Sequence, residues 1–264
     1  LADSDGSLGN MWECPNFTRI ENTDVLIFSP KGLENGFPAS FESGYMLGTM
    51  DYENKKFEHD AYRTLDYGFD FYAPQVMECG TRKILFAWFA IPDSIGKEMK
   101  DGWRHLLTLP RELKVSSDHR LLMTPIKELE KLRMKILDTT LLNKSWVRKV
   151  QNQPLELLIT GQYKEVCLKI EDENEQILEL TVEKGSITLK QKREEEWQQR
   201  MCSYQEENVW KMQIYMDYNT FEVFINDGKY VFSSRIYPDE ALRFMVDVTS
   251  SDKEGRLEMY SLSL

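Results

Sequence analysis

The stretch "TFEVFINDGKYVFSSRIY", residues 220–237, decides the fold class of the chain. Its Asp227-Gly228 pair separates two apolar runs, and glycine tolerates the positive φ that a tight turn requires. Phe221 and Val223 fall on one face of the first run, because strand side chains alternate between the two faces of a sheet. The stretch therefore predicts an antiparallel β-hairpin.

Similar short apolar runs, bounded by turn residues, recur along the whole chain and predict further strands. The clearest are "DVLIFSP", "GYMLGTM", "RKILFAWFA", "HLLTLPREL", "PLELLIT", "VCLKI", "QILELTV", "SITLK", "WKMQIYMD", "TFEVFIN" and "YVFSSRIY". Their regular spacing favours propeller blades or sandwiches over alternating β/α units. The charge run "REEEWQQR", residues 193–200, predicts a solvated loop. The stretch "TPIKELEKLRMKIL", residues 124–137, has helical charge spacing and predicts a short helical or irregular connector.

Composition limits the possible classes of partner. The chain has 264 residues, of which 41% are hydrophobic and 12% aromatic, so a packed core is available. The formal net charge of −11 argues against general nucleic-acid binding, because no broad basic surface could neutralise phosphates. A small phosphate-bearing substrate needs only one or two local cations and is not excluded.

The cysteines and the first residues bear on the compartment. Cys14, Cys79, Cys167 and Cys202 are dispersed and match no zinc spacing, so we expect reduced thiols and no metal. The opening "LADSDGSLGN" lacks the basic and apolar regions of a secretory signal, and no run reaches the roughly 18 apolar residues of a membrane span. These features predict a cytoplasmic protein without a membrane segment.

Four motifs in the first half occur in a fixed order. They are "MWECPNF" (11–17), "GYMLGTMD" (44–51), "DYGFDFYAPQ" (66–75) and "GWRHLLTLPREL" (102–113). Together with "FEVFINDGKYVFSSRIYP" in the second half, they resemble family 32 of the glycoside hydrolases, the β-fructofuranosidases. The likeness covers nearly the whole chain and is strongest to the bacterial members that act on sucrose 6-phosphate.

The resemblance implies an all-β fold: part of a five-bladed β-propeller followed by a C-terminal β-sandwich. We expect the later propeller blades over residues 1–125, a connector over 126–134 and the sandwich over 135–264. The family's nucleophile lies in an "NDPNG" motif and its transition-state stabiliser in an "RDP" motif, and neither motif occurs here. The chain therefore looks like the C-terminal part of such an enzyme, and the missing N-terminal half of the propeller is an expected partner.

Glu13 matches the family's acid/base glutamate, which takes part in retaining hydrolysis of β-fructofuranosides such as sucrose or sucrose 6-phosphate. A carboxylic acid donates a proton near neutral pH only if its surroundings disfavour the charged form. Trp12 and Cys14 would then support the carboxyl without reacting. The alternative is a strand end at which Trp12 packs inward and Pro15 stops the strand.

Other candidates follow from the same motifs, each with a structural alternative. The resemblance implies that Asp51 holds the hydroxyls of the leaving sugar, although a turn acid in "DYENK" fits equally. Tyr72 would line the site beside the acid/base, or it is a buried aromatic whose hydroxyl meets the backbone. Trp88 forms either a sugar-stacking wall or part of the core. Arg104 and His105 are candidates for a phosphate clamp, or simply surface charge.

Two functions remain open at this level. One is a glycosidase whose C-terminal portion carries the acid/base and is inactive alone. The other is a catalytically silent sugar-binding or assembly module, because the two aspartates of the family are absent. Both need only a small sugar or sugar phosphate as ligand, with no cofactor, nucleic acid or membrane.

Overall fold

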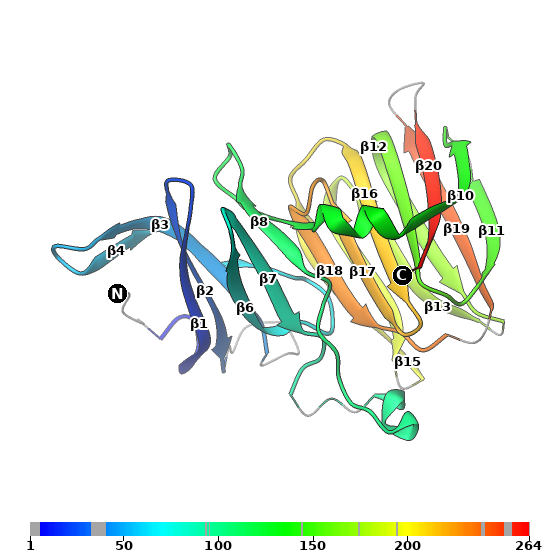
Figure 1. The fold of residues 1–264 in the computed structure, drawn as a ribbon. Coiled ribbons are helices and arrows are strands. Elements are labelled where there is room, and N and C mark those ends of the chain that lie inside the picture. Colours follow the sequence, from blue (N-terminus) through cyan, green and yellow to red (C-terminus); the bar gives the residue numbers. More distant parts are fainter. Residues whose placement is uncertain are drawn as a thin grey trace. The chain divides into compact units, whose positions relative to one another are not determined.

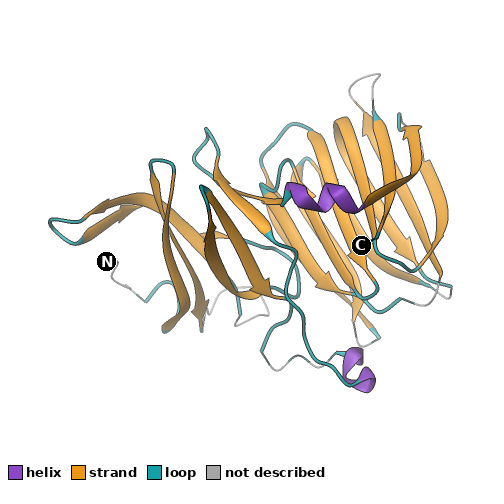
Figure 2. Cartoon of the chain, viewed as in Figure 1, coloured by secondary structure: helices purple, strands orange, loops and turns teal. Residues whose placement is uncertain are grey.

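The computed structural model describes residues 6–32, 41–92, 94, 96–143, 145–173, 175–193, 195–238, 241–250 and 255–263. In this part of the chain almost all regular structure is β-strand, and the helices are two short 3₁₀ turns, η1 Lys97–Asp101 and η2 Lys127–Leu132 (Figure 2). The chain forms two compact units: Leu1–Ile126 with Gly228–Tyr230, and Lys127–Asp227 with Val231–Leu264.

The first unit contains two antiparallel sheets, each built mainly from strands consecutive in sequence (Figure 1). The strands of the first sheet, in spatial order, are β1 Met11–Ile20, β2 Thr23–Lys31, β3 Gly44–Asp51 and β4 Lys56–His59, and the short β5 Arg63–Thr64 also pairs with β3. The strands of the second sheet, in spatial order, are β6 Tyr72–Cys79, β7 Arg82–Trp88, β8 Arg111–Val115 and β9 Leu121–Pro125. Four-stranded meanders of this kind are the repeating blade of β-propellers.

Strand β2 shows why these residues form a blade. Its central residues are buried without interruption, because both faces of the strand are covered. Val25 and Ile27 are fully buried on one face, whereas Leu26 and Phe28 pack in an aromatic and aliphatic cluster on the other. Each of these side chains contributes about 1.5–3 kcal/mol when fully buried.

A buried ion pair holds the loop between β5 and β6 against the second sheet of the first unit. A guanidinium nitrogen of Arg111 on β8 donates to Asp66 Oδ2 over 2.9 Å, and both side chains are inaccessible to solvent. Asp66 Oδ1 also accepts the amide of Gly68, and the Arg111 guanidinium lies 4.9 Å from the centre of the Phe71 ring. The motif "DYGFDFYAPQ" therefore holds its loop against the next sheet through its first residue.

The second unit is a two-layered sandwich whose strands form one continuous, folded sheet (Figure 1). Its strands are β10 Arg133–Thr140, β11 Ser145–Gln151, β12 Leu155–Glu171, β13 Gln176–Glu183, β14 Gly185–Arg193, β15 Glu196–Tyr204, β16 Val209–Asp217, β17 Thr220–Ile225, β18 Tyr230–Arg235, β19 Ala241–Ser250 and β20 Arg256–Leu262. This observation and the structures of relatives reported below confirm the predicted fold class.

The long strand β12 belongs to both layers. Its first half, residues 155–160, pairs with β16 and β20, and its second half, residues 163–171, pairs with β13 and β19. One layer is therefore ordered β10-β20-β12-β16-β17-β18 and the other β15-β14-β13-β12-β19-β11. At the crossing, a Cβ atom on Gly255 would lie 2.2 Å from the hydroxyl of Tyr163, so only glycine fits there.

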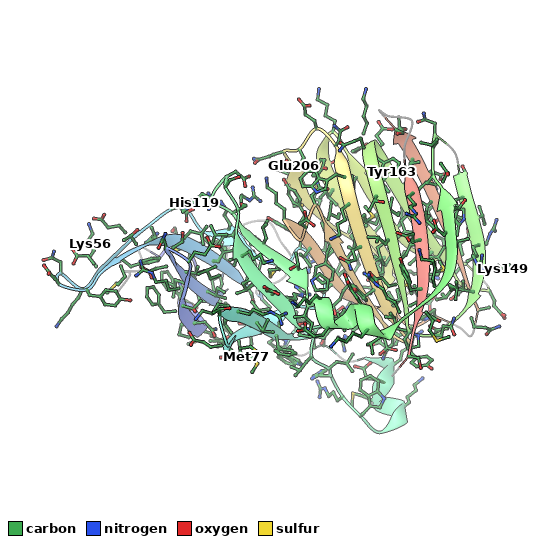
Figure 3. The ribbon with its side chains drawn as sticks, turned by 45° about the horizontal axis from the view of Figure 1, so that its top comes forward. Lys56, Met77, His119, Lys149, Tyr163 and Glu206 are labelled. Atoms are coloured by element: carbon green, nitrogen blue, oxygen red, sulfur yellow. The ribbon has the colours of Figure 1, made fainter. Side chains whose placement is uncertain are left out.

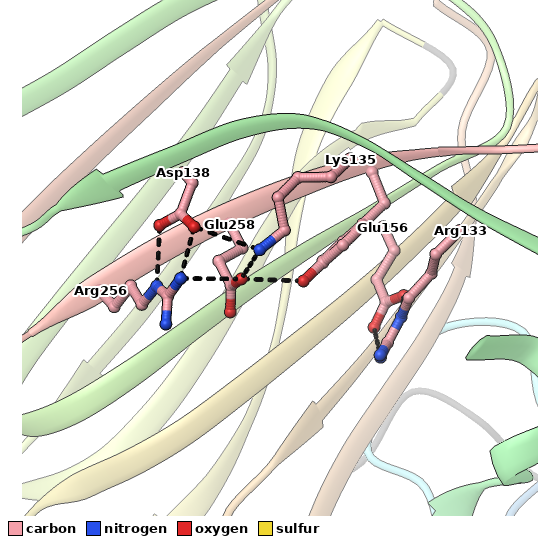
Figure 4. Close-up of polar contacts among 7 residues, drawn as sticks. Arg133, Lys135, Asp138, Glu156, Arg256 and Glu258 are labelled. Carbon is pink, nitrogen blue, oxygen red and sulfur yellow. Dashed lines mark hydrogen bonds and ion pairs between the residues drawn. The ribbon is translucent and has the colours of Figure 1, made fainter.

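A polar network covers part of the outer face of the first layer (Figure 4). The buried carboxylate of Glu156 on β12 accepts two hydrogen bonds from Arg133, of 2.6 and 2.7 Å, and one of 2.7 Å from Gln213. Beside it, oppositely charged side chains of β10 and β20 form a second, more exposed group: Lys135, Asp138, Arg256 and Glu258. These contacts tie the first strand of the unit to its last.

Three predictions of local structure, one loop and two strands, were wrong in detail. The run 193–200 is not a loop, because β15 begins at Glu196 and pairs with β14 along its length; Glu194 lies outside the described residues. "PLELLIT" and "VCLKI" are one strand, β12, because the ladder is only interrupted by an irregularity between Thr160 and Tyr163. In "HLLTLPREL" the strand begins only at Arg111. The predicted hairpin at Asp227-Gly228 is confirmed, with a left-handed backbone at Asn226, Asp227 and Gly228.

Tyr163 makes the second unit sensitive to alkali. Its side chain lies within the strands (Figure 3), is fully buried, and donates to the carbonyl of Leu141 over 3.0 Å. Burial raises the pKa of Tyr163 from 10.0 to about 12. The folded phenol therefore keeps its proton between pH 10 and 12 while the unfolded one loses it, so stability is full below pH 10 and falls above it.

We expect Tyr163 to contribute up to about 1.4 kcal/mol per pH unit to this loss between pH 10 and 12. The free energy of unfolding, measured with urea at several pH values in this range, should fall with pH along a smaller slope for Tyr163→Phe than for the parent chain. Tyr218→Phe, at an exposed position, is the matched control and should leave the slope unchanged. Identical slopes for Tyr163→Phe and the parent would contradict the assignment.

Candidate active site

Glu13 lies on β1 at a break in the strand ladder. It pairs with Ser29 of β2, and the register then shifts before Asn16, as in a β-bulge. The Tyr72 hydroxyl donates to Glu13 Oε2 over 2.5 Å, and the Lys31 ammonium lies 3.9 Å from Oε1. The Glu13 side chain is 30% exposed, so its carboxyl is held by neighbours yet remains accessible to a ligand.

Tyr72 is held firmly beside this carboxyl. The residue is 3% exposed at the start of β6, and the Phe41 ring packs edge-on against its own with 5.5 Å between ring centroids. Burial, followed by the hydrogen bond to Glu13, raises the pKa of Tyr72 well above 10. Its hydroxyl therefore remains neutral in the ordinary pH range and acts as a hydrogen-bond donor to Glu13.

Trp12 and Cys14 flank Glu13 along the chain but do different things. The Trp12 ring stacks on Phe28 at 4.2 Å, and its indole N–H donates to the carbonyl of Leu8 over 3.2 Å. Consecutive strand residues point to opposite faces, so Trp12 fixes the strand from the face that Glu13 does not use. The Cys14 thiol is free and half-buried, and its backbone has a φ of 50°.

Trp88, Arg104 and His105 come together next to Tyr72. Trp88 pairs with Tyr72 across β6 and β7, and its ring lies 4.9 Å from the ring of His105. Arg104 Nε donates to His105 Nε2 over 3.0 Å, and a terminal guanidinium nitrogen donates to the carbonyl of Ser94. The exposed Arg104 guanidinium retains further N–H donors, which suit an anion.

Asp51 lies away from this group. Its carboxylate accepts the amides of Glu53 and Asn54 and the side-chain amide of Asn54, and the Asn54 amide contributes most to lowering the pKa of Asp51. Gly44, at the start of β3, pairs with Phe28, and the next residue of β2, Ser29, pairs with Glu13. Asp51 lies seven residues farther along β3 from Gly44, or roughly 24 Å away. In this structure Asp51 closes the β3–β4 turn, which is the structural alternative left open by the sequence.

Two further residues of the site escaped the sequence analysis. Lys31 ends β2, and the antiparallel register that pairs Met11 with Lys31 is what brings its ammonium to Glu13. Asn16 stands three residues after Glu13 in the quoted motif and bonds to β6. The signal for both was present in the sequence, but it required the register of β1 and β2 and the position of the next sheet.

The family model described as "Glycosyl hydrolases family 32 N-terminal domain" matches residues 1–125, and "Glycosyl hydrolases family 32 C terminal" matches residues 128–261. The chain belongs to family 32 of the glycosyl hydrolases. This confirms the resemblance inferred from the ordered motifs, and Glu13, Tyr72 and Trp88 all lie within the N-terminal match.

Relatives of this family 32 chain include curated hydrolases and solved structures. A sucrose-6-phosphate hydrolase of Staphylococcus xylosus is 32% identical over 88% of the chain, and that of Bacillus subtilis (strain 168) is 32% identical over 87%. A GH32 beta-fructofuranosidase of Bombyx mori is 28% identical and superposes over 99% of the chain with a TM-score of 0.83. The chain spans about half the length of the curated relatives it matches and 56% of the Bombyx mori chain.

The described residues contain neither a metal-type cluster of side chains nor a helix that could span a membrane. No three His, Cys, Asp or Glu side chains there are grouped so that they could hold a metal ion. Neither of the helices in the same residues has the length and apolar character needed to cross a bilayer.

Proposed function

We propose that this chain carries the proton-transferring part of the active site of a retaining β-fructofuranosidase that acts on sucrose or sucrose 6-phosphate. The observation that supports this most is the 2.5 Å hydrogen bond from the buried Tyr72 hydroxyl to the partly exposed carboxyl of Glu13. The relatives named as sucrose-6-phosphate hydrolases, and a Bombyx mori beta-fructofuranosidase variant solved in complex with sucrose, favour the substrate class.

In the proposed mechanism Glu13 first acts as an acid. Its proton passes to the glycosidic oxygen as the bond from that oxygen to the fructosyl carbon breaks, and a second carboxylate bonds to that carbon. Glu13, now ionised, then removes a proton from water as the water displaces the second carboxylate, which restores the acid. Retention by this route requires the two carboxyls to lie about 5–5.5 Å apart.

Tyr72 and Lys31 suit the change of charge at Glu13. When the carboxyl gives up its proton, the neutral Tyr72 hydroxyl donates to one oxygen and the Lys31 ammonium faces the other. A hydrogen bond to a charged group contributes about 1.5–3 kcal/mol. The two residues therefore hold the ionised form in place between the two halves of the reaction.

Trp88, Arg104 and His105 are proposed to meet the substrate beyond the scissile bond. The Trp88 ring offers an apolar face of the kind on which sugar rings stack, and the exposed guanidinium of Arg104 offers the planar donors that phosphate prefers. Asp51 is not included, because it closes its own turn. The cytoplasmic location expected from the free thiols stays a prediction.

The second candidate, a catalytically silent module, is favoured by one observation. The 264 residues contain neither the "NDPNG" nor the "RDP" motif, so the family's nucleophile and stabilising aspartate must come from outside them. A lone general acid supplies only about 10²–10⁴-fold acceleration. Hydrolysis therefore requires those carboxylates, whereas weak sugar binding does not.

The test compares the purified 264-residue chain with the same chain co-expressed with the first half of the Staphylococcus xylosus relative. We expect no release of fructose by the chain alone and turnover by the folded complex, because only the complex contains two carboxyls for the double displacement. Intact-mass and melting measurements establish that the complex has formed. A folded complex without turnover would favour the silent module, and turnover by the chain alone would assign the nucleophile to another of its own carboxylates.

A further inference from the structure

The backbone takes an unusual conformation directly after each of the two paired residues. Cys14, which follows Glu13, has a φ of 50°, and Ala73, which follows Tyr72, has a φ of 48°. Positive φ is uncommon for residues other than glycine and costs of order 1–3 kcal/mol. In both strands the register also shifts at this point, between Glu13 and Asn16 in β1 and between Tyr72 and Gln75 in β6.

One side chain joins the two irregular segments. The Asn16 amide nitrogen donates to the carbonyls of Cys14 and Pro74, each over 2.9 Å, and its oxygen accepts the backbone amide of Val76, also over 2.9 Å. Two of these partners are carbonyl oxygens and the third is an N–H, so the opposite orientation of the amide would satisfy none of them. Asn16 thus uses both ends of its amide to hold β1 against β6.

We infer that Asn16 is a positioning residue that holds the Glu13 carboxyl and the Tyr72 hydroxyl in register with each other across two sheets. The inference rests on the proposed acid/base role of Glu13 and adds to it the device that sets the geometry. The three hydrogen bonds of the Asn16 side chain go to backbone groups, so Asn16 acts through the backbone of Cys14 and of Pro74, the residue that follows Ala73.

The geometry explains why such a device is needed. Glu13 and Tyr72 lie on different sheets, and their contact of 2.5 Å leaves little tolerance for sliding of one strand past the other. A shift of one residue would turn either side chain to the opposite face of its sheet. Misplacement of a catalytic group by 1 Å can cost about 10²-fold in rate.

The test uses the 264-residue chain labelled with ¹³C at the ζ carbon of tyrosine, whose chemical shift reports the hydrogen bond of each phenol. The Tyr72 signal is assigned by its loss in Tyr72→Phe, and its position without the hydrogen bond to residue 13 is given by Glu13→Ala. We expect Asn16→Ala to move the Tyr72 signal toward its Glu13→Ala position. Asn16→Gln, which keeps an amide but adds one methylene group, should move it in the same direction with less effect on folding.

Asn226 provides a matched control in the second unit. Its side-chain nitrogen donates to the Tyr204 hydroxyl and the Asn208 carbonyl, its oxygen accepts the backbone amides of Trp210 and Lys211, and the residue is buried. Asn226→Ala should lower the melting temperature while leaving the Tyr72 signal in place. If Asn16→Ala and Asn16→Gln also lower only the melting temperature, Asn16 is a structural residue and the inference is overturned.

An activity measurement separates this inference from the proposed function. In the complex with the missing half, Asn16→Ala should lower kcat by about 10²-fold with little change in KM, because substrate contacts are intact. Full activity of Glu13→Gln in that complex would refute the proposed function, while the Tyr72 signal would still report whether Asn16 holds the pair. A normal kcat for Asn16→Ala beside an inactive Glu13→Gln would overturn the positioning role alone.

Discussion

In the complex of the chain with the first half of the Staphylococcus xylosus relative, Glu13→Gln is expected to lower the rate of sucrose hydrolysis by about 10²–10⁴-fold. This is the usual contribution of a general acid. Glutamine has nearly the shape of glutamate and its carbonyl oxygen still accepts the Tyr72 hydroxyl, so the site keeps its geometry. What is lost is the proton for the departing sugar oxygen. The measurement is the initial rate of fructose release by the parent and variant complexes.

The choice of leaving group makes this prediction specific to proton donation. A nitrophenyl β-fructofuranoside departs as a stable phenolate and needs no proton, so Glu13→Gln should retain much more activity on it than on sucrose. Glu53→Gln, an exposed carboxyl on the β3–β4 turn, is the matched control and should behave as the parent on both substrates. An equal loss on both substrates would mean that Glu13 binds or positions substrate instead of protonating it.

Arg111→Met should destabilise the first unit by about 3–5 kcal/mol, because it leaves the carboxylate of Asp66 buried without its cation. Methionine keeps apolar contact with the Phe71 ring, so the lost charge accounts for most of the effect. Urea denaturation measures the change. An exposed pair gives the control: Lys56→Met removes a partner of Glu58 and should cost at most about 1 kcal/mol.

The double replacement Asp66→Asn with Arg111→Met tests how much of the loss comes from a buried charge left without its counter-ion and how much from the lost attraction between the two charges. Once neither side chain carries a charge, the pair no longer leaves an uncompensated buried charge, and we expect part of the lost stability to return. If the double variant is as unstable as the sum of the single ones, the two side chains are not coupled, which would contradict a stabilising ion pair. A loss for Arg111→Met no larger than that for Lys56→Met would contradict the buried-pair assignment.

The correct parts of the sequence prediction depend on interactions between residues that are close in sequence. The hairpin at Asp227-Gly228 follows from turn residues that accept a left-handed backbone, and β2 follows from a continuous apolar run between turn residues. In both cases the deciding interactions lie within a few residues. The order of four short motifs added the family, and the family added the fold.

The errors came from features that depend on distant parts of the chain. The charged run that contains Trp197 predicts a loop, yet it forms the edge strand β15, where one side of the backbone pairs with β14, Glu196 stays exposed and Arg200 is buried. The length of β12 depends on partners up to about 100 residues away in sequence, β19 and β20. No window of the sequence contains these partners.

The candidate site shows the same division. Glu13 and Tyr72 were paired through the family motifs, and the structure places their side chains in hydrogen-bond contact. Asp51 belongs to an equally recognisable motif, but its carboxylate accepts hydrogen bonds from Glu53 and Asn54 of its own turn. Asn16 could be recognised only when β1 and β6 were seen together, because its bonds join residues about 60 positions apart.

The dual membership of β12 also orders events during protein synthesis. Both layers need β12, and each of them lacks a neighbour of β12 until β19 or β20 has been made. After β16 has been made and before β19 has been made, while the ribosome translates residues 218–240, β12 therefore has one unpaired edge in each half, and such edges associate readily with other nascent chains. Loss of the seven-residue β20 by a late stop codon would leave the first half of β12 paired only with β16 and would remove the partner strand of β10, so this layer can close only after β20 has emerged from the exit tunnel.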